Sequence, residues 1–309
     1  MSGEVLFGAL SAAVNIFLIV AVGSISTFGG VRRDRSNQYQ YGNNPEIGAL
    51  ENHSQQEAGS GPRGSTPCYR VEGSGPLLIY IAGLDGTGEL FFKQAPALAR
   101  SYRVMSFRSR DYGRFSYEDL ADDVAALIRD AGADRATIVA ESFGGGVAFT
   151  FALRYPDMVE RLVIINSFAR FRGRAKIRAG ILLASALPFW ATSVVRRTAN
   201  EVALRADGVK GEDRQRFFKA IRTVKRDDYT QRLKLIAKLD VEDRLGEIHA
   251  PTLFIAGQKD LLVPSAREAR LMAARMPNAT VRLIPGAGHA CLLGDRVRLS
   301  DILAEWIGR

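Results

Sequence analysis

The sequence predicts an α/β fold: a mostly parallel sheet covered by helices on both faces, with a helical cap inserted between two strands and an N-terminal membrane helix. Three observations predict it. From Tyr69 onward, short apolar runs alternate with segments of helical periodicity. This alternation breaks once, in a segment rich in helix formers, and residues 5–31 carry no charge. Because strands joined by long helical crossovers lie parallel, the alternation indicates a sheet that is buried on both faces.

The composition suits one large domain with an appendage, or two small domains. Of the 309 residues, 47% are hydrophobic and 24% are charged, which is an ordinary globular balance. The two cysteines, Cys68 and Cys291, lie far apart and form no Cys-x-x-Cys pair. We therefore expect no disulfide framework, no metal ion and no cofactor.

The N-terminus contains an apolar stretch, residues 5–22, at the lower length limit for a membrane-spanning helix. A cleaved signal peptide is the alternative, but residues 1–4 contain no Lys or Arg to provide its basic start. Three arginines follow the stretch instead: Arg32, Arg33 and Arg35. The flanking charges favour an uncleaved, single-pass anchor in residues 1–33, with the rest of the chain on the cytoplasmic side.

The domain organisation follows from the composition beyond this anchor. Residues 34–66 are rich in Ser, Gly, Asn and Gln and show no periodicity, so we expect a flexible linker there. Residues 67–309 are expected to form the globular domain.

The expected elements of this domain follow one another in regular order. Strands are predicted at residues 76–82, 102–107, 136–140, 162–166, 252–256 and 280–284. Helices are predicted at residues 116–131, 143–154, 265–276 and 299–307. The first of these helices has Ser116 as its cap and two acidic residues, Glu118 and Asp119, in its first turn.

A candidate nucleophile lies between the third strand and the second helix, in Ala-Glu-Ser-Phe-Gly at residues 140–144. This strand–turn–helix context is that of a nucleophile elbow, with Ala140 in place of the first glycine of G-x-S-x-G. The alternative is a serine near the start of an ordinary helix. Three glycines follow at 144–146, and each costs a helix about 1 kcal/mol relative to alanine. Close packing at a tight turn would offset that cost, so we predict Ser142 as the nucleophile.

One histidine has the position of its base. His53 lies in the linker and His249 in a turn before a strand, whereas His289 directly follows the last predicted strand. A nucleophilic serine needs a base within hydrogen-bond reach, and we predict His289. Asp260 follows the strand at 252–256 and completes the order Ser, Asp, His, so we predict that it orients the imidazole. A turn residue or helix cap is the alternative for this aspartate.

The loop after the first predicted strand reads Gly-Leu-Asp-Gly-Thr-Gly, residues 83–88. We expect the backbone N–H of Leu84 to pair there with that of Phe143 as an oxyanion hole. The loop matches neither glycine-rich phosphate-binding pattern. Asp85 is expected to cap the turn or order the loop, without a chemical role.

Together these segments resemble the α/β-hydrolase superfamily over residues 76–309, cap insertion included. The sequences Gly-Leu-Asp-Gly-Thr-Gly at 83–88 and Glu-Ser-Phe-Gly-Gly at 141–145 are similar to those of bacterial hydrolases related to plant esterase/lipase/thioesterase acyltransferases. Ala82 stands where the commoner pattern has the histidine of His-Gly. The resemblance implies hydrolysis of a carboxylic ester or thioester through an acyl-enzyme, or acyl transfer from the same intermediate. A non-catalytic, membrane-tethered binding protein of this fold is a third alternative. A haloalkane dehalogenase is disfavoured, because its nucleophile is Asp and position 142 is Ser.

The predicted cap, about residues 168–245, holds the basic charge of the chain. Residues 168–240 carry 18 Lys and Arg against 7 Asp and Glu, a net +11 in a chain of net charge +9. An apolar run at 181–195 within it is either a buried cap helix or an entrance for a lipophilic acyl chain. Its basic flanks also suit an anionic membrane surface. Nucleic acid is not expected as a partner, because no recognised binding module accompanies the charge.

Overall fold

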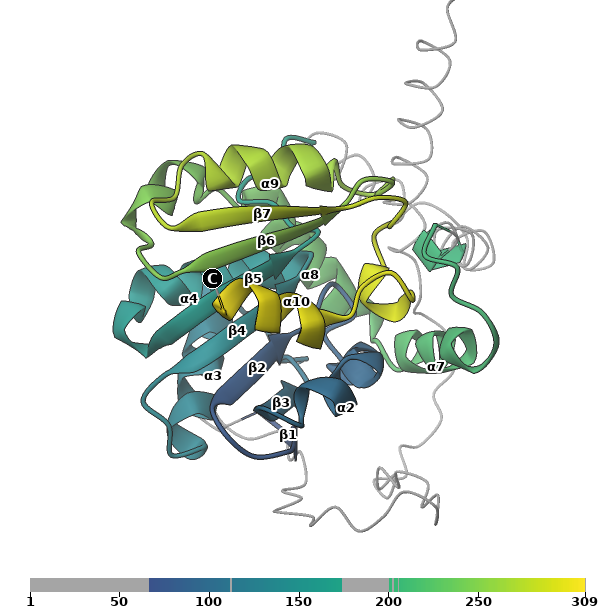
Figure 1. Cartoon of the computed structure of the whole chain (residues 1–309), viewed down its shortest axis with the longest axis horizontal. Helices are drawn as coiled ribbons and strands as arrows, with labels where there is room; N and C mark the ends of the chain where they lie inside the picture. Colours follow the sequence, from purple (N-terminus) through teal and green to yellow (C-terminus); the bar gives the residue numbers. More distant parts are fainter. Residues whose placement is uncertain (1–66, 112, 174–199, 202, 205, 309) are drawn as a thin grey trace, which may run out of the picture.

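Seven strands form one sheet in the order β1-β3-β2-β4-β5-β6-β7 in this computed structural model, which describes residues 67–111, 113–173, 200–201, 203–204 and 206–308 (Figure 1). The strands are β1 (Tyr69–Glu72), β2 (Leu77–Ile81), β3 (Arg103–Phe107), β4 (Ala136–Glu141), β5 (Val159–Ile165), β6 (Thr252–Gly257) and β7 (Ala279–Ile284). All neighbouring strands pair in parallel except β1, which is antiparallel to β3. The mostly parallel sheet is therefore as predicted.

Helices connect the strands from β2 onward. They are α2 (Ala95–Leu98), α3 (Tyr117–Asp130), α4 (Phe143–Arg154), α7 (Gly211–Arg222), α8 (Arg226–Lys238), α9 (Ser265–Ala273) and α10 (Leu299–Ile307). Short 3-10 turns are η1 (Glu89–Lys93), η2 (Pro156–Met158), η3 (Glu242–Glu247) and η4 (Cys291–Leu293). Ser116 caps α3 as expected: its hydroxyl accepts the Asp119 N–H, and the Asp119 carboxylate accepts the Ser116 N–H.

Two hydrophobic clusters lie on opposite faces of the sheet. In β2, Leu77, Ile79 and Ile81 face the cluster that α3, α4, α8 and α9 cover. Leu78 and Tyr80 face the other cluster, which α2 and α10 cover. Every residue of β2 is buried, because successive side chains of a strand point to opposite faces and both faces are covered here.

Strand β1 is the one strand that the sequence did not predict. It has four residues, and its side chains are half-buried or exposed rather than a continuous apolar run. Tyr69 and Val71 pack against the cluster on one face of the sheet, and charged residues alternate with them. Four residues are at the lower limit of length at which such an alternation identifies a strand.

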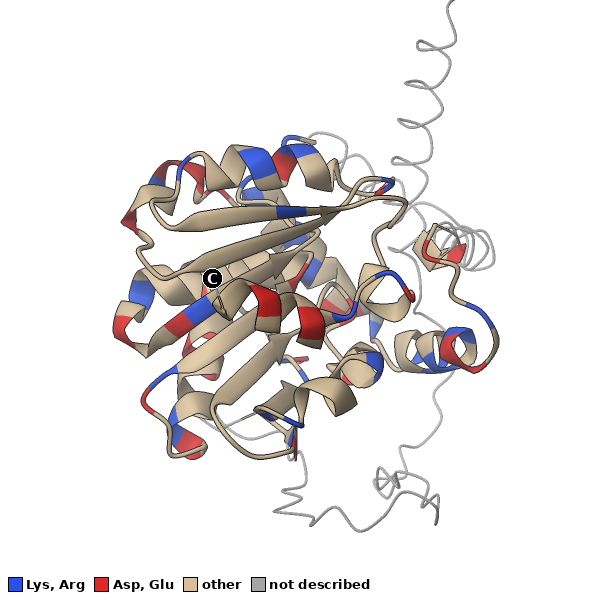
Figure 2. Ribbon diagram, viewed as in Figure 1, with Lys and Arg blue, Asp and Glu red and all other residues tan. Residues whose placement is uncertain are grey.

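The cap elements α7 and α8 lie between β5 and β6, where the insertion was expected. A third cluster packs Phe217 of α7 and Leu204 against Leu90 and Leu293, which belong to loops at the carboxyl edge of the sheet. Figure 2 shows acidic as well as basic residues along α7. The apolar run at 181–195 lies outside the described residues.

The predicted anchor and linker, residues 1–66, also lie outside the described part of the chain. Within the described ranges, no helix is long and apolar enough to cross a membrane.

Candidate active site

Ser142 occupies a sharp turn between β4 and α4. Its backbone has φ 53° and ψ −116°, a conformation that non-glycine residues rarely adopt. Neighbouring groups hold it there: the Ser142 N–H donates to the Ile165 carbonyl at 2.9 Å, and the Ser167 hydroxyl donates to the Ser142 carbonyl at 2.6 Å. The turn directs the chain from the sheet into the helix, as expected for a nucleophile elbow.

The glycines after Ser142 allow this turn to lie close to the sheet. A Cβ on Gly144 would lie 2.5 Å from the Ile81 carbonyl oxygen, and one on Gly145 would lie 2.0 Å from the Ser167 hydroxyl. Any side chain at either position would push α4 away from β2 or β5. The cost of glycine in a helix is thus offset by close packing, the explanation that the sequence suggested.

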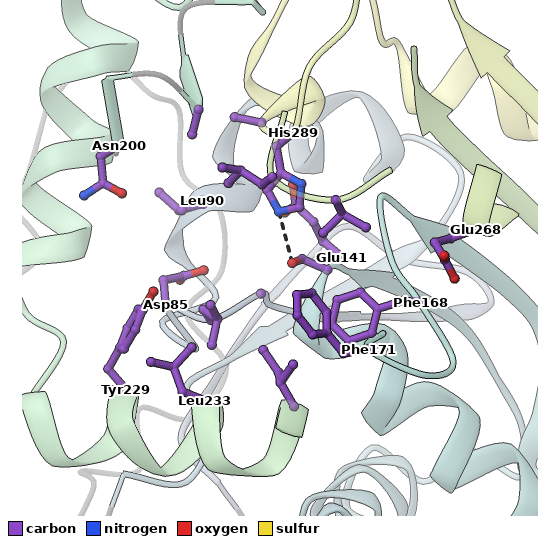
Figure 3. Close-up of a pocket in the computed structure, with 18 of the residues that line it drawn as sticks. Asp85, Leu90, Glu141, Phe168, Phe171, Asn200, Tyr229, Leu233, Glu268 and His289 are labelled. Atoms are coloured by element: carbon purple, nitrogen blue, oxygen red, sulfur yellow. Dashed lines mark hydrogen bonds between the residues drawn. The ribbon is translucent and has the colours of Figure 1, made fainter. Parts of the chain in front are cut away.

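The three predicted polar residues meet at the carboxyl edge of the sheet. His289 Nε2 lies 3.0 Å from Ser142 Oγ (dashed in Figure 3), and His289 Nδ1 lies 2.7 Å from Asp260 Oδ2. His53 lies outside the described residues, and the His249 carbonyl accepts a hydrogen bond from Asn278. The arrangement has the connectivity of a serine–histidine–aspartate triad.

Asp260 makes the contacts of both interpretations that the sequence left open. Its Oδ1 accepts the N–H groups of Leu262 and Val263 at 2.9 and 3.1 Å, as a turn aspartate does. Its Oδ2 accepts the Ser265 hydroxyl and faces His289. The turn at the start of α9 therefore fixes the carboxylate that faces the imidazole.

The loop that carries His289 is held by two polar residues from distant segments. Asn166 Nδ2 donates to the carbonyls of Gly288 and His289, each at 2.9 Å, while Asn166 Oδ1 accepts the Gly257 N–H at 2.8 Å. Asp207, from the cap, accepts the Gly288 N–H at 2.7 Å. Sequence reasoning missed both. For Asn166 the signal was a polar residue at the end of an apolar run, whereas nothing local marked Asp207.

The glycine loop after β2 lies beside Ser142. A Cβ on Gly83 would lie 3.5 Å from the Ser142 Cβ, and Leu84 and Asp85 line the same cavity as Ser142. Asp85 orders the loop, because its Oδ1 accepts the Thr87 N–H at 2.9 Å and the Thr87 hydroxyl at 2.5 Å. Phe143 is the first residue of α4, where helical N–H groups lack an intrahelical acceptor.

Comparison with known proteins agrees with this geometry. The family model for the alpha/beta hydrolase fold matches residues 76–295. The chain belongs to the α/β-hydrolase family.

Several relatives and solved structures resemble this hydrolase along most of their length. Two proteins named "Putative carbamate hydrolase RutD" resemble it at low identity. The one from Serratia proteamaculans is 28% identical over 75% of this chain and 91% of its own length. The one from Stutzerimonas stutzeri is 27% identical over 76% and 93%. A hydrolase from Pseudomonas aeruginosa superposes with a TM-score of 0.68 at 25% identity, over 78% of this chain and 94% of that structure. The esterase EaEST from Exiguobacterium antarcticum has a TM-score of 0.67 at 18% identity, over 78% and 95%, and shows the shared fold.

Two groups of this hydrolase's site have perturbed proton affinities. Burial alone would lower the pKa of His289, but the adjacent Asp260 carboxylate overrides burial and raises it. Burial raises the pKa of Glu141 to about 7, although the hydrogen bond from Tyr80 and the charge of His289 oppose that shift. Glu141 directly precedes the nucleophile and lines the same cavity. Glu141 therefore titrates near neutral pH, whereas the pKa of His289 lies above its usual value.

A cavity of about 340 Å³ opens onto Ser142 and His289. Most side chains around it are apolar and come from both the core and the cap (Figure 3). They include Leu84, Leu90, Phe168, Phe171, Phe217, Ile221, Leu233, Ile236, Leu262, Val263 and Leu293. Among the residues that the structure describes, no group of three His, Cys, Asp or Glu side chains is placed to hold a metal ion.

Proposed function

We propose that this hydrolase cleaves a carboxylic ester or thioester with a lipophilic acyl group, through an acyl-enzyme on Ser142. One observation carries the proposal: Ser142 Oγ lies 3.0 Å from the His289 nitrogen and opens into a largely apolar cavity. An apolar pocket with a few converging polar groups suits an acyl chain that ends in a reactive carbonyl.

In the acylation step that we propose, Ser142 Oγ attacks the substrate carbonyl carbon while His289 Nε2 takes the hydroxyl proton. Asp260 accepts the Nδ1–H of His289, which holds the tautomer and stabilises the imidazolium. The N–H groups of Leu84 and Phe143 are the proposed donors to the oxyanion. His289 then gives its proton to the leaving alcohol or thiol.

Water completes the cycle in this proposal. His289 takes a proton from water as the oxygen attacks the acyl carbon, and then returns it to Ser142 Oγ. If an alcohol attacks instead, the same intermediate performs acyl transfer. Carbamate hydrolysis is the second candidate, and the name of the relatives favours it. A carbamate presents a carbonyl carbon to the same nucleophile.

We also propose a membrane location. Residues 1–33 would form a single-pass anchor, and residues 34–66 would tether the domain at 67–309 on the cytoplasmic side. The uncharged stretch at 5–31 and the arginines after it support this. Membrane lipid would then be a partner through the anchor and through the basic cap. Alkaline carbonate extraction of the full-length protein tests the anchor, and release into the supernatant would contradict it.

Covalent labelling tests the reaction. Full-length protein and its Ser142→Ala variant are treated with a fluorophosphonate probe, and we expect labelling of the wild type only. Equal labelling of the two would refute the serine-hydrolase proposal and leave a binding protein of this fold.

Turnover then identifies the acyl group. p-Nitrophenyl esters of graded chain length, a matched thioester and a matched carbamate are compared by kcat/KM, with an added alcohol to detect acyl transfer. We expect the longer acyl esters to exceed the acetate. A carbamate turned over faster than every ester would favour the second candidate.

A further inference from the structure

Arg232 is a fully buried arginine in cap helix α8, with 2% of its surface exposed. Its Nη1 donates to the carbonyls of Leu84 and Asp85 at 3.2 and 3.1 Å, and its Nη2 donates to the Arg110 carbonyl at 3.2 Å. These carbonyls belong to the loops that follow β2 and β3. One side chain of the cap therefore fastens two loops at the carboxyl edge of the sheet.

A cation in this place is costly to maintain. Burial lowers the pKa of Arg232, against the nearby charges of Asp85 and Asp228, which raise it. Its Nε has no hydrogen-bond partner among the described atoms. If this residue served only to pack α8 against the core, an apolar side chain would do so without the desolvation cost of a buried cation. The hydrogen bonds to main-chain carbonyls distinguish arginine from such a residue.

The glycine loop is shaped around the guanidinium. Gly86 has φ +61°, and a Cβ there would lie 2.4 Å from the Cζ of Arg232. The Gly86 N–H donates to the Gly83 carbonyl at 3.1 Å, which closes a tight turn around Leu84. The two carbonyls that Arg232 holds directly follow the Leu84 N–H along the chain.

Helix α8 also lines the substrate cavity. Tyr229, Leu233 and Ile236 face the cavity from one side of this helix. Arg232 adjoins them in sequence, and its guanidinium contacts the loop at residues 83–88. The wall of the acyl pocket and the support of the loop are thus parts of one rigid element.

We propose that Arg232 is a positioning residue, which fixes the loop at 83–88 so that the Leu84 N–H is aimed at the oxyanion of the reacting acyl group. The inference rests on the proposed function, because an oxyanion forms only if Ser142 attacks a carbonyl. In this proposal the cap covers the pocket and also contributes the residue that positions the oxyanion donor. Loss of Arg232 weakens stabilisation of the transition state more than binding of the substrate.

The test compares full-length wild type with Arg232→Met, on the best p-nitrophenyl ester. We expect kcat to fall about 100-fold with KM little changed, as for a displaced oxyanion donor. The inhibition constant of a trifluoromethyl ketone, which forms a tetrahedral adduct with the serine, should rise by a similar factor. In Arg232→Ala, which vacates the space of the side chain, added guanidinium ion should restore part of kcat. Arg244→Met is the matched control, since Arg244 is an exposed arginine that pairs with Glu247.

A folded Arg232→Met protein with wild-type kcat and wild-type inhibition would overturn the inference. So would a loss of activity that parallels a loss of native near-UV signal and is not rescued by guanidinium in Arg232→Ala. If the Met variant does not fold, Arg232→Lys decides by the same kinetic measurements. Lysine keeps the charge but lacks the planar fork that reaches three carbonyls, so unchanged kcat in this variant also overturns the inference. A wild type that no fluorophosphonate labels instead refutes the proposed function.

Discussion

The hydroxyl of Tyr80 donates a 2.7 Å hydrogen bond to the carboxylate of Glu141, the residue that directly precedes Ser142. Tyr80 is buried in β2 and stacks on Phe91 at 4.1 Å between ring centroids. The phenol is thus fixed by packing, and it holds the carboxylate beside the catalytic centre. The negative charge of Glu141 raises the pKa of His289, although less than Asp260 does.

This pair predicts a shift in the pH dependence. His289 must be neutral to accept the serine proton, so kcat/KM falls as the pH drops through its raised pKa. Glu141→Gln removes the negative charge that Glu141 carries above its own pKa of about 7 and that stabilises the imidazolium, which lowers the pKa of His289. The acidic limb of kcat/KM, measured from about pH 5 to 9, is expected to move to lower pH. Glu118→Gln changes an exposed acid on α3 and should leave the limb in place; equal shifts in both variants would contradict the prediction.

The double role of Asp260 allows its catalytic part to be isolated. Asp260→Asn keeps the oxygen that accepts the N–H groups of Leu262 and Val263, so the turn should persist. It removes the carboxylate that faces His289, and we expect kcat to fall about 10⁴-fold with a melting temperature close to the wild type's. Ser265→Ala removes one hydrogen bond to the same carboxylate and should cause a much smaller loss. Full activity in Asp260→Asn would reduce this residue to a turn former.

The elements of the sheet could be predicted from the sequence because their signals are local. Buried strands such as β2 and β6 are short apolar runs, and α3 has both an apolar face and a capping box. Ser142, Asp260 and His289 could be singled out in the sequence because each lies in the turn or loop that follows a strand. The carboxyl ends of parallel strands meet at one edge, so side chains that are distant in sequence converge there.

The supporting residues could not be predicted because their partners are far away in the sequence. Asp207 contacts Gly288, 81 residues on, and Arg232 contacts the Leu84 carbonyl, 148 residues back. In the sequence, Arg232 is one more basic residue of a basic cap. Only the folded chain shows that this cation is buried, whereas Arg244 is solvent-exposed.

The glycines of the elbow predict a stability difference. Gly144→Ala would place a methyl group 2.5 Å from the Ile81 carbonyl oxygen, a backbone atom that cannot move aside cheaply. We expect a loss of about 1–3 kcal/mol in the free energy of unfolding, together with reduced activity as the elbow shifts. Gly246→Ala is the control, because its nearest neighbour, the Arg275 carbonyl, would be 3.5 Å away. Urea unfolding of both variants measures the difference, and equal stabilities would contradict the close approach.

The start of the cap is fixed by an ion-pair network. Arg172 pairs through one nitrogen with Glu242 and through another with Glu268, each at a shortest distance of 2.8 Å. Both carboxylates are buried, but Glu242 keeps a second partner in Arg275, so Arg172→Ala deprives chiefly Glu268 of compensation. We expect the free energy of unfolding to fall by about 1–3 kcal/mol. This loss of stability should shrink as the pH is lowered, because burial raises the pKa of Glu268 and its carboxylate can then take up a proton. Arg244→Ala breaks an exposed pair with Glu247 and should cost much less, because water screens this pair. Similar losses in both variants would contradict the burial argument.

Two substitutions of Asp207 separate two effects of this residue. One is its hydrogen bond to the loop that carries His289, and the other is the effect of its negative charge on the pKa of His289. Asp207→Ala leaves the buried Gly288 N–H without its acceptor, and we expect a loss of about 1–3 kcal/mol in the free energy of unfolding. The same change frees the loop that carries His289, so kcat should fall by about tenfold or more. Asp207→Asn retains an acceptor oxygen, so kcat at high pH should stay near the wild-type value. Because the Asp207 charge raises the pKa of His289, its removal should move the acidic limb of kcat/KM to lower pH. If the Asn variant loses as much kcat at high pH as the Ala variant does, the hydrogen bond to Gly288 is not what positions the histidine.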